Sequence, residues 1–169
     1  MAILGNILTA ISYIIFWTSR FCKNKKKILI VDNISRLITI LSFLCLKNLN
    51  GIQNTFFVLI RNELGHRVKN KKKYIAFFIM LAILFFMYYL SFEFPSTIFI
   101  AVCGITNLIG VILCETKWLR IWGMIGSIPY ILFQLSIKNY AGTICEFITL
   151  IIMLYTFFTI EIKRKESKI

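Results

Sequence analysis

Acidic residues are scarce in this sequence, which has 7 Asp and Glu against 20 Lys and Arg and only 16% charged residues. Soluble domains have about 25% charged residues, so the composition disfavours a water-soluble fold. The five cysteines form no C-x-x-C pair and have no histidine at ligand spacing, which argues against a metal site. The sequence also lacks a phosphate-binding glycine loop and the H-E-x-x-H and G-x-S-x-G motifs. We therefore predict that the protein is not an enzyme and holds no cofactor or metal.

Apolar residues dominate what is present: they make up 59% of the chain, and the mean hydropathy is +0.79. A net charge of +13 would indicate nucleic-acid binding if it formed a patch on a soluble surface. The basic residues instead form short clusters between long apolar runs, as they do on the cytoplasmic flanks of membrane helices. This pattern predicts an all-α integral membrane protein whose partner is the lipid bilayer, not nucleic acid.

Seven apolar runs can be compared with the roughly 20 residues that a helix needs to cross about 30 Å of hydrocarbon. We predict transmembrane helices over Ile3–Ser19, Ile28–Leu46, Gly51–Glu63, Tyr74–Phe92, Ser96–Cys114, Trp118–Ile137 and Tyr140–Ile162. The third run is short and contains Gln53, Asn54 and Arg61. An interfacial or re-entrant segment is therefore the alternative for this run.

The distribution of Lys and Arg favours seven spans. If all seven runs cross the membrane, all but three of the 20 basic residues fall on one side, including those of Arg20–Lys27 and Arg61–Lys73. Without the third span these two clusters would lie on opposite sides, against the positive-inside rule. We therefore predict an external N-terminus and a cytoplasmic C-terminus.

The two halves of the chain resemble each other. Leu44–Gly51 reads LCLKNLNG and Leu135–Gly142 reads LSIKNYAG, while GNILTAISYII from Gly5 resembles CGITNLIGVIL from Cys103. Membrane chains with repeated halves are typical of transporters built from two similar bundles. We expect the Asn and Gly of the repeated Lys-Asn-x-x-Gly to be turn residues. We predict a single membrane domain, 1–169, that contains two parallel three-helix repeats. The first repeat covers 1–63, the second covers 96–162, and a linker helix over 74–92 joins them.

Four segments resemble the YgjV family of small bacterial inner-membrane proteins. They are GNILTAISYIIFW near the start, DNISR in the second predicted helix, NGIQNTFFVLIRN in the third and KNYAGTICE in the seventh. The three-plus-one-plus-three layout is similar to that of SWEET sugar transporters, and SemiSWEETs form it as dimers of one three-helix unit. The resemblance covers essentially the whole chain and implies a SWEET-like fold in the bacterial cytoplasmic (inner) membrane. SWEETs carry a proline in each helix of a hinge set, whereas this chain has only Pro95 and Pro129.

Polar side chains inside the apolar runs are candidates for a binding site, because such residues normally face a protein interior or a water-filled cavity. Uncharged side chains that donate and accept hydrogen bonds suit a hydroxyl-rich or amide-bearing solute. The candidate substrate-binding residues are Asn54, Asn107, Gln134, Tyr130 and Thr9.

Three charged residues in the same runs are candidates for a gate or a proton site. Asp32 and Arg36 lie four residues apart on one predicted helix, a spacing that fits either a gate or a structural ion pair. Glu146 is a candidate proton site for coupled transport. The alternative is that Glu146 lies close enough to the outer face to stay hydrated.

Three classes of function fit these observations. We predict a facilitator or proton-linked transporter that moves a small polar solute, such as a sugar or vitamin precursor, by alternating access between the two bundles. A non-transport scaffold or accessory protein is the alternative, and it would have a dry, tightly packed axis. A membrane-embedded enzyme acting on lipids would need an acid/base cluster, for which only Asp32, Arg36 and His66 are available. Homo-oligomerisation is compatible with each class.

Overall fold

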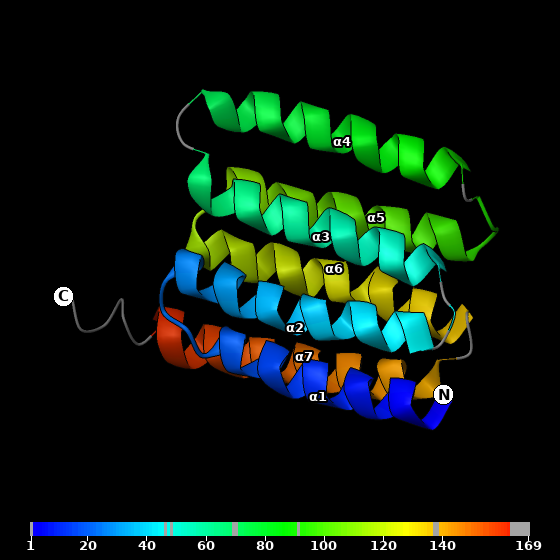
Figure 1. Cartoon of the computed structure of the whole chain (residues 1–169). Helices are drawn as coiled ribbons and strands as arrows, with labels where there is room; N and C mark the ends of the chain where they lie inside the picture. Colours follow the sequence, from blue (N-terminus) through cyan, green and yellow to red (C-terminus); the bar gives the residue numbers. More distant parts are fainter. Residues whose placement is uncertain are drawn as a thin grey trace.

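The computed structural model describes residues 2–45, 47, 49–68, 71–90, 92–136 and 139–162, and every regular element within these ranges is helical (Figure 1). The helices are α1 (Ala2–Arg20), α2 (Lys25–Cys45), α3 (Leu49–Arg67), α4 (Lys72–Leu90), α5 (Ser96–Leu108), α6 (Thr116–Ser136) and α7 (Tyr140–Thr156). Helices α5 and α7 each continue into a π-helical segment, Ile109–Leu113 and Phe157–Ile162 respectively.

Each predicted apolar run coincides with one of these helices, so the all-helical prediction is confirmed. The third run differs most, because α3 extends from Leu49 to Arg67 rather than from Gly51 to Glu63. Most of the added residues are polar or glycine, so they do not extend the apolar run in the sequence, although they continue the helix. The predicted helix ends at Leu46 and Ile137 lie outside the described residues.

Four of the described helical segments are long and apolar enough to cross a membrane. They are Lys25–Cys45, Lys72–Leu90, Ser96–Leu113 and Tyr140–Ile160. The least buried of the four is on α4, where Phe78 is 64% exposed, Phe86 64% and Tyr89 82%. So large an exposed apolar surface would be unfavourable in water and indicates contact with another apolar phase.

The helices form two layers with α4 along one edge (Figure 1). In the first layer α2 lies between α1 and α3, and in the second layer α6 lies between α5 and α7. The layers meet where α1 contacts α7 and where α3 contacts the π-helical extension of α5. At the second junction α3 approaches closely, since a Cβ on Gly65 would clash with Cγ1 of Val111. Helix α4 packs against α3 and α5.

The glycines of the repeated Lys-Asn-x-x-Gly lie inside helices, so the prediction that they are turn residues is wrong. Gly51 belongs to α3 and Gly142 to α7, and both are buried. A Cβ on Gly51 would lie 2.8 Å from the ring of Phe43, and one on Gly142 would lie 2.7 Å from Nδ2 of Asn139. Asn139 caps α7, because its Oδ1 accepts a hydrogen bond from the Gly142 N–H at 3.0 Å. Asn48 lies outside the described residues. The two glycines therefore permit close packing at the start of α3 and α7.

Candidate functional site

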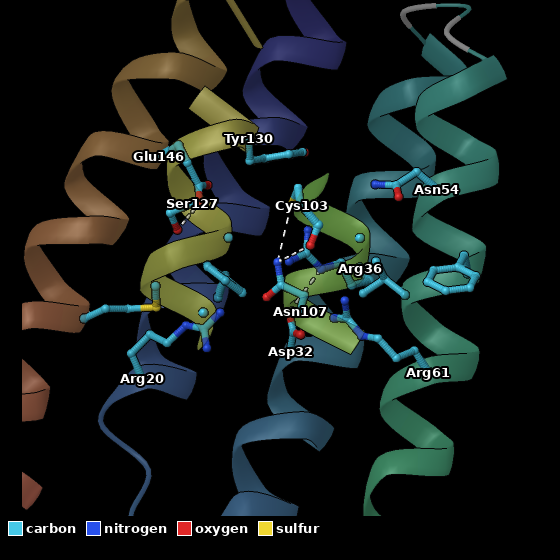
Figure 2. Close-up of a pocket in the computed structure, with 17 residues that line it drawn as sticks. Arg20, Asp32, Arg36, Asn54, Arg61, Cys103, Asn107, Ser127, Tyr130 and Glu146 are labelled. Atoms are coloured by element: carbon cyan, nitrogen blue, oxygen red, sulfur yellow. Dashed lines mark hydrogen bonds and ion pairs between the residues drawn. The ribbon is translucent and has the colours of Figure 1, made fainter. Parts of the chain in front are cut away.

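A polar cavity of about 60 Å³ lies between the two layers (Figure 2). All six helices of the two layers line it, and α4 is not part of its lining. Its polar lining residues are Arg20, Asp32, Arg36, Asn54, Arg61, Cys103, Asn107, Ser127, Tyr130 and Glu146. One water molecule needs about 10–15 Å³ of cavity volume. In this conformation the cavity therefore has room for a few water molecules but not for a solute as large as a sugar.

Asp32 and Arg36 form the local ion pair that their spacing allows. The Arg36 Nε donates to Oδ1 of Asp32 at 3.1 Å. The second carboxylate oxygen accepts a hydrogen bond of 2.7 Å from Nδ2 of Asn62 on α3. Asp32 is only 4% exposed, so this carboxylate links α2 to α3 as well as balancing one arginine.

Two further arginines face the cavity, although the sequence places them in the basic clusters that flank the membrane. Arg61 is 5% exposed, and its Nε and Nη2 donate to Oδ1 of Asn62 at 3.3 and 3.1 Å. The Cζ of Arg20 lies 4.0 Å from the ring centroid of Phe16, and its buried Nε has no hydrogen-bond partner within the described ranges. The Cζ of Arg36 lies 4.9 Å from the same ring centroid. In the described part of the chain, neither Arg20 nor Arg61 pairs with a carboxylate.

Helical spacing could have identified both arginines. Arg61 lies seven residues after Asn54, and Arg20 lies seven residues after Tyr13. Residues seven apart share one helix face, so each arginine continues a polar face that reaches into an apolar run. Because Arg20 and Arg61 lie at or near the end of an apolar run, the sequence predicts instead that both flank the membrane.

Glu146 lies inside the protein, where it joins three helices. Its Oε1 accepts a hydrogen bond of 2.9 Å from Ser127 Oγ on α6, and its Oε2 accepts one of 3.2 Å from Tyr13 OH on α1. Glu146 is 6% exposed. This burial argues against the alternative that it stays hydrated at the outer face.

The predicted residues Asn54, Asn107 and Tyr130 line the main cavity. Asn54 Oδ1 accepts a hydrogen bond of 3.0 Å from the hydroxyl of Tyr88. Tyr88 belongs to α4, so this helix positions a side chain of the cavity, a role that its apolar sequence did not indicate. Asn107 Nδ2 donates to its own helix, to the carbonyl oxygen of Cys103 at 2.9 Å.

The other two predicted binding residues, Thr9 and Gln134, line a second cavity of about 20 Å³ that shares three lining residues with the first. Thr9 Oγ1 lies 2.7 Å from Ser42 Oγ, which joins α1 to α2. Gln134 Oε1 accepts a hydrogen bond of 2.9 Å from Nδ2 of Asn139, the N-cap of α7. Both side chains therefore contribute to packing within a layer.

The described residues contain no group of three or more His, Cys, Asp or Glu side chains that could hold a metal ion. His66 does not line either cavity, and its ring lies beside Glu63, with Nε2 3.7 Å from the carboxylate. The described lining of the main cavity offers hydrogen-bonding groups and charges of both signs, from three arginines and two carboxylates.

Comparisons with curated proteins and with solved structures found no matching protein. A family model described as "Bacterial inner membrane protein" matches residues 3–164, which is nearly the whole chain. The match agrees with the exposed apolar surface of the helices and with the four segments quoted above. The chain therefore belongs to the Imp-YgjV family of bacterial inner membrane proteins.

Proposed function

We propose that the protein transports a small polar solute across the inner membrane by alternating access between its two layers. The observation that carries this proposal is the polar cavity, because both layers line it and it lies where they meet. Placing polar groups inside a membrane protein is energetically unfavourable, and such groups commonly mark the path of a solute or ion. A scaffold, the alternative, has no need for a polar cavity along its axis.

In the proposed topology all seven helices span the membrane, with the N-terminus outside and the C-terminus in the cytoplasm. The positions of two turns support it. Lys25, at the start of α2, donates its Nζ to the carbonyl oxygen of Cys114 after α5 at 2.7 Å. The turns after α1 and after α5 therefore lie at the same end of the molecule, as expected if α3 crosses.

The contacts between helices also support two equivalent, SWEET-like repeats. A twofold rotation about an axis parallel to the helices would exchange α1 with α5, α2 with α6 and α3 with α7 (Figure 1). This rotation would convert the contact between α1 and α7 into one between α5 and α3. The structure contains the first contact and, through the π-helical extension of α5, the second.

Labelling of native cysteines tests the topology. Cys22, Cys45 and Cys114 are each partly exposed near a helix end, so variants that keep one of them and replace the other cysteines by serine can be compared. We expect a membrane-impermeant maleimide to label Cys45 in intact spheroplasts, and to label Cys22 and Cys114 only after permeabilisation. If α3 does not span, Cys114 will lie on the opposite side from Cys22, and that result would contradict the proposed topology.

Solute uptake tests the function. Purified protein in liposomes is incubated with a mixture of sugars, nucleosides and vitamin precursors, and the solutes taken up are identified by mass spectrometry. We expect Asn107→Ala to reduce uptake by about fivefold, because each hydrogen bond contributes about 1 kcal/mol. Asn6→Ala is the matched control, since Asn6 is exposed on α1 and lines neither cavity.

The outcome of this assay separates transport from the scaffold alternative. Uptake above that of empty liposomes, reduced by Asn107→Ala and retained by Asn6→Ala, would support transport through the cavity. The absence of uptake of any solute by the wild-type protein would favour a scaffold. Equal uptake by Asn107→Ala and the wild-type protein would exclude this cavity as the route.

A further inference from the structure

We infer that the solute is an anion whose carboxylate or phosphate group binds between Arg20 and Arg61. This inference rests on the proposed transport function and names the class of solute for the same cavity. Neither the candidate residues of the sequence analysis nor the resemblance to sugar transporters indicates a negatively charged solute.

The positive and negative charges around the cavity do not balance. Among the residues that the structure describes, three arginines line it, but only two carboxylates do, those of Asp32 and Glu146. Asp32 pairs with Arg36 and accepts a second hydrogen bond from Asn62, while Glu146 accepts two hydrogen bonds from hydroxyl groups. Among the described residues, the guanidinium groups of Arg61, which is buried, and Arg20, which is partly buried, therefore have no carboxylate in contact. A buried charge is unfavourable unless an opposite charge balances it, and a bound anion would supply that charge.

Two of the arginines lie beside the same aromatic ring. Arg20 and Arg36 both lie within 5 Å of the centroid of the Phe16 ring, so two positive charges share one aromatic side chain. Such a group of like charges is unfavourable in a medium of low dielectric constant. The buried Nε of Arg20 is also left without a hydrogen-bond partner in the described chain. Guanidinium groups bind carboxylate and phosphate through paired N–H donors, so an oxyanion would satisfy both the charge and the free donor.

The cavity is polarised in a way that suits such a solute. Figure 2 shows Arg20 and Arg61 toward one end of the view, together with Asp32, and Asn54, Tyr130 and Glu146 toward the other. We place the anionic group of the solute against the arginines. Its uncharged part would then contact the amide and hydroxyl groups.

Arg120 shows what a structural arginine in this protein is like. It is 1% exposed, and it donates to the carbonyl oxygens of Arg20 and Cys22 and to the Thr156 hydroxyl. Its guanidinium group therefore bonds backbone and side chain on several elements. Arg20, by contrast, has an aromatic ring beside it and an unused donor.

Binding of simple oxyanions tests the inference. The protein is reconstituted in phosphatidylcholine nanodiscs, and its Tm is measured in phosphate, acetate, chloride and glycerol, with the salts at equal ionic strength. We expect phosphate or acetate to raise the Tm above its value in chloride, because a ligand that binds the folded state stabilises it. Glycerol, an uncharged solute, controls for non-specific effects.

Three variants assign the response to its residues. Arg20→Gln and Arg61→Gln should each weaken the anion response by about tenfold or more, since each removes a charge-assisted hydrogen-bond donor. Arg67→Gln is the matched control on α3, because Arg67 is exposed and pairs with Glu63 outside the cavity. An unchanged anion response in both cavity variants would overturn the inference.

Stability without an anion supplies a second readout. If the two arginines bind solute, each Gln variant removes an unbalanced buried charge, and its Tm in chloride should equal or exceed that of the wild-type protein. If the arginines are structural, both variants should have a lower Tm in chloride. That decrease would overturn the inference even if the anion response were also lost.

Two further comparisons identify the source of the anion and separate binding from transport. A Tm increase in nanodiscs containing phosphatidylglycerol, with no response to phosphate or acetate, would assign the arginines to a lipid headgroup and overturn the solute assignment. Uptake of neutral sugars without any anion response would overturn the inference but leave transport standing. Anion binding that depends on Arg20 and Arg61, without uptake of any solute, would support the site and contradict the proposed transport.

Discussion

Replacing Asp32 by asparagine is expected to lower the free energy of unfolding by about 3–5 kcal/mol, because it removes one partner of a buried ion pair. Asp32 is 4% exposed and is bonded to both Arg36 and Asn62. Without the charge of Asp32, Glu146 would be the one carboxylate left among the described lining residues to balance the three arginines of the cavity. The loss can be measured as a decrease in stability during titration with sodium dodecyl sulfate in mixed micelles.

The surface pair of Glu63 and Arg67 provides the control. Both side chains are substantially exposed, so Glu63→Gln should change stability by at most about 1 kcal/mol. The double variant Asp32→Asn/Arg36→Gln should recover part of the stability that Asp32→Asn loses, since it removes the charge that Asp32 balances. If Asp32→Asn is as stable as the wild-type protein, the carboxylate does not balance the arginines, and the charge argument for the cavity fails.

Replacing Arg120 by glutamine should lower the free energy of unfolding by about 3 kcal/mol or more, since hydrogen bonds of charged groups contribute about 1.5–3 kcal/mol each. The last carbonyl groups of a helix lack partners within the helix. Arg120 reaches from α6 to bind the carbonyl oxygen of Arg20, the last residue of α1, and that of Cys22 just beyond it. The same titration in mixed micelles measures the effect.

Lys117 is the matched control for Arg120, because it also lies near the start of α6 but is exposed. Lys117→Gln should leave stability within about 0.5 kcal/mol of the wild-type value. A loss of stability in Lys117→Gln as large as in Arg120→Gln would show that net charge near the membrane surface, and not the bonds of Arg120, determines the result.

The helices could be predicted from the sequence because each is a separate apolar run bounded by polar or basic residues. The predicted ends of α1, at Ile3 and Ser19, differ by one residue from the observed ends. The weak third run could be retained as a predicted span, because without it the Arg20–Lys27 and Arg61–Lys73 clusters would lie on opposite sides of the membrane. Its C-terminal end was missed, because Gly65, His66 and Arg67 are not apolar and yet continue the helix.

The site could be predicted only in part. The spacing of polar residues identifies the polar face of a helix, but it does not show which residues of other helices contact that face. Asp32 and Arg36 lie four apart on one helix, so their pairing was visible. The bond between Tyr13 and Glu146 joins the first and last helices of the chain, and nothing local indicates it. The side chain of Gln134 has the donors and acceptors that a solute-binding residue needs. Its Oε1, however, accepts a hydrogen bond from Asn139, the N-cap of the next helix.

The bonds of Arg120 and Lys25 have a consequence for the order of events in a transport cycle. Both join the first layer to the second at the end of the molecule where α1 terminates. Separating the layers there must first release these charge-assisted bonds, which are among the strongest hydrogen bonds in proteins. Under the proposed topology that end faces the cytoplasm. Discharge of the solute into the cell, rather than its capture from outside, would then be the step that carries the activation barrier set by Arg120.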